Sequence, residues 1–314
     1  MINLSRGRFT GVYDRYRWLR SDGAPNFNQR VVKRPGTAAL LAKRCKEIYS
    51  PGISILQIFE IFYRESIQVL PLIKIGRRID SVVSVRELIS LLGGVYTSLI
   101  EVKHGGKLIE ALNREPAKSI SRRDFPMVRE EADLEEVLET LILGEKGYVI
   151  VVDKDDNLVG YITDRDIIEF FREKRVGIKV SEVMSSQLIT MNLTSNLCDV
   201  IREMNILNIR RIPLVREDRS VSGIVLARDI IDFIGSHAFF KYASTGLYEE
   251  FCKLPSGIVA RDIATISPEA DIGEASEKML SQNIDYLLVT SGDEIIGIIT
   301  ERDIIYGYVV LSRS

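Results

Sequence analysis

One short motif occurs four times in this chain and constrains its fold more than any other feature. The copies begin at residues 81, 160, 223 and 297 and have the sequences SVVSVRELI, GYITDRDII, GIVLARDII and GIITERDII. Each copy starts eight positions after the last residue of a short apolar run, and turn-forming stretches such as DKDDN lie between the two. Two apolar runs separated by a polar turn are typical of a β-hairpin. Because the spacing is kept four times, it indicates repeated structural units.

The segment upstream of each hairpin has the spacing of an amphipathic helix. In the third copy, apolar residues recur at i, i+3, i+4 and i+7, which places them on one helical face: Leu197, Val200, Ile201 and Met204. A further short strand precedes the helix, most clearly in QLITMN and IATIS. We therefore expect an α/β fold of the α+β type with four β-α-β-β-α units. A unit of about 60 residues is marginally stable alone, so we expect two pairs, residues 37–175 and 176–314.

The motifs and the strand-helix-strand-strand order before them resemble the CBS-domain family, whose repeats end in G-h-h-[ST]-x-x-D, where h is apolar. The resemblance covers residues 37–314. It implies two Bateman modules of paired repeats, an architecture similar to the gamma subunit of AMP-activated protein kinase. It also implies clefts for an adenine nucleotide (AMP, ADP or ATP), with S-adenosylmethionine less favoured. The family brings no catalytic residues, so the resemblance implies a regulator that acts on a partner protein, with the modules closing within one chain or across a homodimer.

The helix start after each hairpin has two interpretations. A hydroxyl residue followed three positions later by an acid forms a capping box, which needs no ligand, and Ser84 with Glu87 fits that interpretation well. The resemblance implies instead that the Asp accepts from ribose hydroxyls while the Thr lies near the ribose or phosphate. Leu226 replaces the hydroxyl residue in the third repeat, which leaves Asp229 without a reciprocal box. The expected ligand contacts of this kind are Thr163, Asp166, Asp229, Thr300 and Asp303.

Phosphate groups need donors, which helix N-termini and arginines supply. An arginine occupies the same position in every motif, and three of these are candidate phosphate ligands: Arg165, Arg228 and Arg302. The alternative is a structural pair with a nearby acid, such as Glu169 four residues after Arg165. Arg210 and Arg211 precede the strand IPLV, where the resembled family often has a basic residue facing phosphates. These two are the strongest phosphate candidates.

The N-terminal extension, residues 1–36, differs from the rest in charge. Residues 1–44 carry +8 and the remainder carries -10. Arginines alternate with aromatic residues in RGRFTGVYDRYRWLR, a composition that suits single-stranded nucleic acid. The alternative is an arm that packs against the acidic remainder. Nucleic-acid binding through residues 6–34, with the repeats as a regulatory part, is therefore the second candidate function.

Composition argues against several other classes. The chain has 46% hydrophobic and 27% charged residues, no apolar run of the length that a membrane span needs, and no secretory signal, so we expect a cytoplasmic globular protein. Three widely spaced cysteines and two histidines support neither a disulfide framework nor a metal site, and we expect reduced thiols. No nucleophile, metal cluster or acid/base pair stands out, so we do not expect an enzyme.

Overall fold

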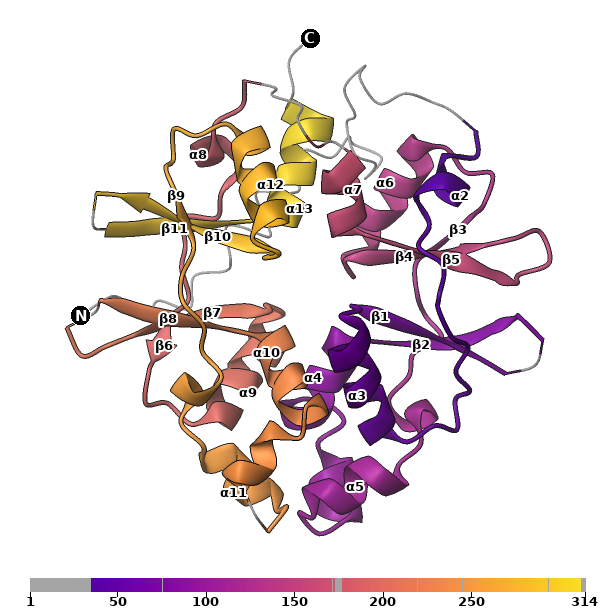
Figure 1. The fold of residues 1–314 in the computed structure, drawn as a ribbon, viewed down its shortest axis with the longest axis vertical. Helices are drawn as coiled ribbons and strands as arrows, with labels where there is room; N and C mark the ends of the chain where they lie inside the picture. The colour runs from indigo at the N-terminus through magenta and orange to yellow at the C-terminus, as the bar shows by residue number, and fades with distance from the viewer. Residues whose placement is uncertain are drawn as a thin grey trace.

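A computed structural model describes residues 35–74, 76–170, 172, 177–218, 220–243, 245–292 and 294–311. It contains four small sheets, each covered by helices and arranged around a common centre (Figure 1). The basic segment 6–34, and with it the nucleic-acid interpretation, lies outside the described residues. No helix in the described part of the chain has both the length and the apolar character that crossing a bilayer requires.

Repeats one and two make up the first half of the described chain. After α2 (Thr37–Leu41), repeat one contains α3 (Ile55–Glu65), β1 (Val69–Ile73), β2 (Ile79–Ser84) and α4 (Val85–Gly93). A linker follows with η2 (Leu99–Lys103), α5 (Leu108–Arg114) and η3 (Ala117–Ser119). Repeat two contains β3 (Met127–Arg129), α6 (Leu134–Gly144), β4 (Tyr148–Val152), β5 (Leu158–Thr163) and α7 (Asp164–Phe170).

Repeats three and four have the same order. Repeat three contains α8 (Val180–Val183), β6 (Met191–Asn192), α9 (Leu197–Leu207), β7 (Arg211–Val215), β8 (Val221–Leu226) and α10 (Ala227–Gly235). A second linker holds η4 (Ala238–Lys241), α11 (Tyr248–Lys253) and η5 (Ser256–Ile258). Repeat four contains β9 (Thr265–Ile266), α12 (Ile272–Ser281), β10 (Tyr286–Ser291), β11 (Glu294–Thr300) and α13 (Glu301–Tyr306), followed by η6 (Gly307–Leu311).

The hairpins have a common register. In each, the last strand residue before the motif helix pairs with the first residue of the preceding strand, as Thr163 does with Tyr148 and Thr300 with Tyr286. The short leading strands β3, β6 and β9 pair in parallel with β4, β7 and β10, and in repeat one a single parallel bridge joins Tyr49 to Leu72. The expected β-α-β-β-α order and mixed α/β class are therefore confirmed.

Two kinds of apolar core hold the repeats together. Helices of repeats one and three share one large core, and helices of repeats two and four share another. Between sheets, β1 and β2 pack on β4 and β5, while β8 packs on β10. Each repeat therefore contacts one neighbour through its sheet and another through its helices, as the ring of four in Figure 1 shows.

A short segment crosses the edge of each motif strand. The four bridges, each closed by two backbone hydrogen bonds of 2.9 to 3.1 Å, are Lys43 with Tyr161, Arg122 with Val82, Ser185 with Ile298 and Arg261 with Ile224. We call Lys43, Arg122, Ser185 and Arg261 the crossing residues. The crossing explains the motif glycine, because a Cβ on Gly160 would lie 2.4 Å from the Lys43 carbonyl oxygen. The corresponding distance from Gly297 to the Ser185 oxygen is 2.8 Å.

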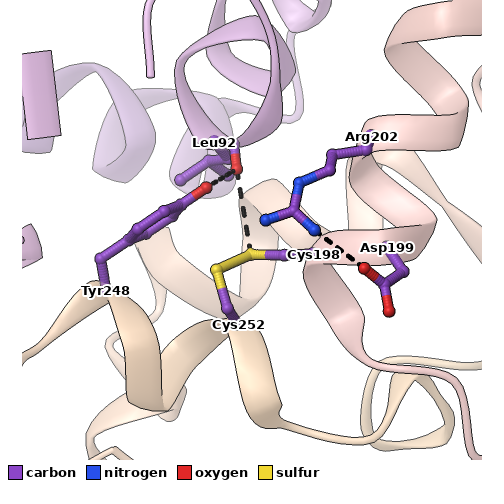
Figure 2. Close-up of a disulfide and its surroundings, with 6 residues drawn as sticks. All are labelled: Leu92, Cys198, Asp199, Arg202, Tyr248 and Cys252. Atoms are coloured by element: carbon purple, nitrogen blue, oxygen red, sulfur yellow. Dashed lines mark hydrogen bonds and ion pairs between the residues drawn. A yellow bond between two sulfur atoms is a disulfide. The ribbon is translucent and has the colours of Figure 1, made fainter. Parts of the chain in front are cut away.

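The expectation of reduced thiols was wrong for two of the three cysteines. Cys198 on α9 and Cys252 on α11 form a disulfide, shown in Figure 2. They are 54 residues apart, and they meet because α11 packs on α9, where the Tyr248 hydroxyl also donates to the Leu92 carbonyl at 2.5 Å. Cys45 remains free. Burial, and to a smaller extent the nearby Glu65 charge, raises the pKa of its thiol to about 11.

Candidate functional site

The acid of each motif is hydrogen-bonded to its own helix start. Asp303 Oδ2 accepts from the Thr300 backbone nitrogen at 2.9 Å and from the Thr300 hydroxyl at 2.7 Å. Asp166 Oδ2 accepts from both groups of Thr163 at 2.8 and 2.6 Å. The capping interpretation therefore accounts for one oxygen of each carboxylate and leaves the contacts of the other oxygen to be described.

The partner of the second carboxylate oxygen differs between repeats. Asp166 Oδ1 lies 2.5 Å from Lys43 Nζ. Both oxygens of Asp229 accept from the Arg261 guanidinium, with Nε at 3.0 Å from Oδ2. Asp303 Oδ1 has no hydrogen-bond or ion-pair partner within the described ranges, and it is not among the buried polar atoms there that lack a partner. Among the described residues, Asp303 is therefore the one of these three acids whose second oxygen has no partner.

Two motif arginines bind helix C-termini in the opposite half of the chain. Arg228 donates to the carbonyls of Phe62 and Ile67, at the end of α3, at 2.6 and 2.7 Å, and it pairs with Asp232. Arg165 donates to the Ile284 carbonyl after α12 at 3.1 Å and pairs with Glu301, not with Glu169, the acid considered as its structural alternative. Cations at helix C-termini are stabilising, so these contacts have a structural explanation that needs no nucleotide.

Charged side chains from all four repeats meet between the modules. We call this set the four-repeat charge cluster: Arg86, Asp164, Arg165, Arg210, Arg211, Asp285, Glu301 and Arg302. Two pairs in it are bidentate, and the Arg302–Asp164 pair is buried. Arg302 binds Asp164 through distances of 2.9 to 3.1 Å, and Arg211 binds Asp285 at 2.5 and 3.1 Å.

Neighbouring arginines repel one another in this cluster. Burial, and to a smaller extent the Asp285 charge, raises the pKa of Glu301 to about 8. Burial lowers the pKa of Arg210 to about 10, with the Arg211 and Arg86 charges acting in the same direction. An anion placed here would relieve that repulsion.

Arg210 and Arg86 have donors that no described residue satisfies. The half-buried Arg210 side chain has no hydrogen-bond or ion-pair partner in the part of the chain that the structure describes, and it lies against Gly147, where a Cβ would be 3.3 Å from Nη1. Arg86 donates through Nη2 to the Glu145 carbonyl at 2.8 Å, but its Nε is buried without a partner among the described residues. A buried donor without a partner, such as this Nε, lowers the stability of the fold unless a ligand or water accepts its hydrogen bond.

Arg86 is a residue that sequence reasoning assigned to the motif but not to the ligand. The one sequence signal for Arg86 is that it occupies the same motif position as the other three arginines.

The described residues contain no group of three or more His, Cys, Asp and Glu side chains that could hold a metal ion. The chemistry of the site is thus carboxylate acceptors beside guanidinium and backbone donors, which suits recognition of a polyhydroxylated anion.

Comparison with known proteins identifies the family. A model described as the CBS domain matches residues 117–173, 180–236 and 256–309, more than half of the chain. The chain therefore belongs to the CBS-domain family. The matched segments are repeats two to four, and repeat one has the same element order despite Ser81 and Glu87 at the positions of the motif Gly and Asp.

Two archaeal proteins are similar to this chain over most of its length. The chain is 29% identical over 241 residues to uncharacterized protein MJ1225 of Methanocaldococcus jannaschii, covering 75% of this chain and 85% of that protein. It is 26% identical over 253 residues to an uncharacterized 33.4 kDa protein of Thermofilum pendens, covering 80% and 84%. The crystal structure of MJ1225 superimposes with a TM-score of 0.78 at 24% identity, covering 86% of this chain and 98% of that one. The fold is therefore that of a four-repeat CBS protein.

Proposed function

We propose that this protein is a non-catalytic sensor of adenine nucleotides, AMP, ADP or ATP, that passes the bound state to a partner protein. One observation carries the proposal. Within the described residues, Asp303 has a carboxylate oxygen without a partner, and Arg210 and Arg86 have donors without partners in the four-repeat charge cluster nearby. A nucleotide offers ribose hydroxyls that donate and phosphate oxygens that accept, so one ligand satisfies both sets.

Family membership supports the same function. The similar protein of Methanocaldococcus jannaschii has been described as a proposed archaeal homologue of g-AMPK. We divide the chain into a first module of residues 37–175 and a second of residues 176–314, with residues 1–36 as an extension. Since the helical cores join the modules within one chain, a single copy brings all four repeats together.

The motif arginines provide a route for transmission. Arg302 is next to Asp303 on α13, and its guanidinium binds Asp164 of repeat two. A ligand that pulls on Asp303 therefore acts on the contact between the second module and the first. It changes the relative orientation of the modules only if it binds one orientation more tightly than another, and the different charges of AMP and ATP supply such a difference in the cluster.

Thermal unfolding with a nucleotide panel tests the proposal. AMP, ADP or ATP should raise the melting temperature of the wild-type chain, because a ligand that binds only the folded state stabilises it. Asp303→Ala should abolish that rise, whereas Asp262→Ala, a change at an exposed Asp of the same repeat, should preserve it. Arg210→Gln should reduce the response to AMP but leave any response to adenosine unchanged. The proposal fails if no member of the panel, including S-adenosylmethionine, stabilises the wild-type chain.

A further inference from the structure

The crossing residues place different side chains beside equivalent acids. The backbone geometry is the same in each case, because every crossing residue makes a reciprocal pair of hydrogen bonds with the second residue of a motif. The side chains are not the same: lysine in repeat two, arginine in repeat three and serine in repeat four. We propose that the crossing residue decides which site accepts a nucleoside, so that Ser185 leaves the Asp303 site open while Lys43 and Arg261 occupy the other two.

In repeat two the crossing residue pairs with the carboxylate oxygen that a ribose hydroxyl would need. Lys43 Nζ lies 2.5 Å from Asp166 Oδ1, and Oδ2 is already held by Thr163. A ribose hydroxyl can reach this carboxylate only by displacing the lysine. The Lys43 side chain is 52% exposed, so water screens the pair and displacement is possible at a cost in affinity.

In repeat three the obstruction is more complete. Arg261 places Nε and Nη2 on the two oxygens of Asp229, and the Leu226 backbone nitrogen also donates to Oδ2. A planar guanidinium matches the geometry of a carboxylate, so this pair is harder to displace than a lysine contact. The Asp229 site should therefore be the weakest of the three.

Ser185 has neither the reach nor the charge for such a contact. Its backbone pairs with Ile298 at 2.9 Å in both directions, which matches the crossing at the other sites, yet Asp303 Oδ1 is left without a partner among the described residues. The open site thus follows from one small side chain. Repeat one is outside this comparison because it has Glu87 in place of Asp, while Arg122 pairs with Asp124.

The inference rests on the proposed function, and calorimetric titration with AMP tests the two separately. The wild-type chain should show one tight site, which Asp303→Ala removes. Ser185→Lys should weaken that site by about fivefold to 100-fold, since it introduces a cation that competes for Asp303. Ser186→Lys adds the same charge at the next, exposed residue and should leave the affinity unchanged.

Removing the cations should open the other sites. Lys43→Ser and Arg261→Ser keep the backbone crossing, and each should add a binding event, whereas Lys46→Ser on the same exposed segment should add none. If the wild-type chain binds AMP through Asp303 but the crossing variants leave affinity and stoichiometry unchanged, the inference is wrong and the proposed function stands. If neither the wild-type chain nor the Lys43→Ser and Arg261→Ser variants bind any member of the nucleotide panel, both are wrong.

Discussion

Loss of the disulfide between Cys198 and Cys252 should destabilise the second module strongly. The bond closes a loop of 54 residues that contains β7, β8 and α10. Loop-closure entropy for that length corresponds to about 4 kcal/mol at 25 °C. Because domains have free energies of unfolding of roughly 5 to 15 kcal/mol, this bond accounts for a large part of the total.

The perturbation to use is Cys252→Ala. Cys198 is 1% exposed in the helical core, so truncating it would also leave a cavity, whereas Cys252 is only partly buried. Urea unfolding should give a free energy of unfolding about 4 kcal/mol lower for the variant than for the oxidised wild-type chain. Dithiothreitol should lower the wild-type value toward that of the variant and leave the variant itself unchanged.

Cys45→Ala is the matched control, because Cys45 is free and lies far from this loop in sequence. It should retain the full response to dithiothreitol. The reasoning is refuted if Cys252→Ala unfolds within about 1 kcal/mol of the oxidised wild-type chain, a difference well below the loop-closure value. A thiol assay of the unfolded, non-reduced protein that finds three free thiols would refute the disulfide itself.

Three further perturbations test the packing and the charge cluster. Arg228→Ala should lower the free energy of unfolding by about 2 to 4 kcal/mol, because it leaves two carbonyls of the first module unpaired, and urea unfolding would measure the loss. Gly160→Ala should destabilise by about 1 to 3 kcal/mol, because its Cβ would meet a backbone oxygen at 2.4 Å, while Gly52→Ala, whose nearest contact is 3.3 Å, should not. Stability should fall as pH rises from about 4.5 to about 8, because folded Glu301 keeps a proton that the unfolded chain releases. Glu301→Gln should flatten that dependence, and an unchanged slope would contradict the raised pKa.

The sequence predicted the architecture because the repeat is local. Hairpin spacing, helical periodicity and the motif glycine all lie within one unit, so each copy carries the signal independently. Gly160 and Gly223 could be recognised as motif positions, although their physical reason, the approach of a crossing backbone, became visible only in three dimensions.

What could not be predicted depends on contacts between units. The crossing residue Lys43 lies more than a hundred positions from Asp166, and neither pairing nor distance follows from periodicity. The disulfide could not be predicted for the same reason, since its cysteines meet only because α9 and α11 pack together. Arg302 was predicted to face a ligand, and the structure gives it Asp164 as a partner because the two motif helices α7 and α13 pack together.

The central claim is that the free oxygen of Asp303 accepts from the hydroxyls of a ribose. The most direct measurement is a calorimetric cycle with AMP and its 2′,3′-dideoxy analogue, each titrated into the wild-type chain and into Asp303→Ala. The account predicts that removing both hydroxyls weakens binding to the wild-type chain by about one to four decades, and that Asp303→Ala, which removes the tight site, leaves no difference between AMP and its analogue. Equal affinity of the wild-type chain for AMP and its dideoxy analogue would contradict it.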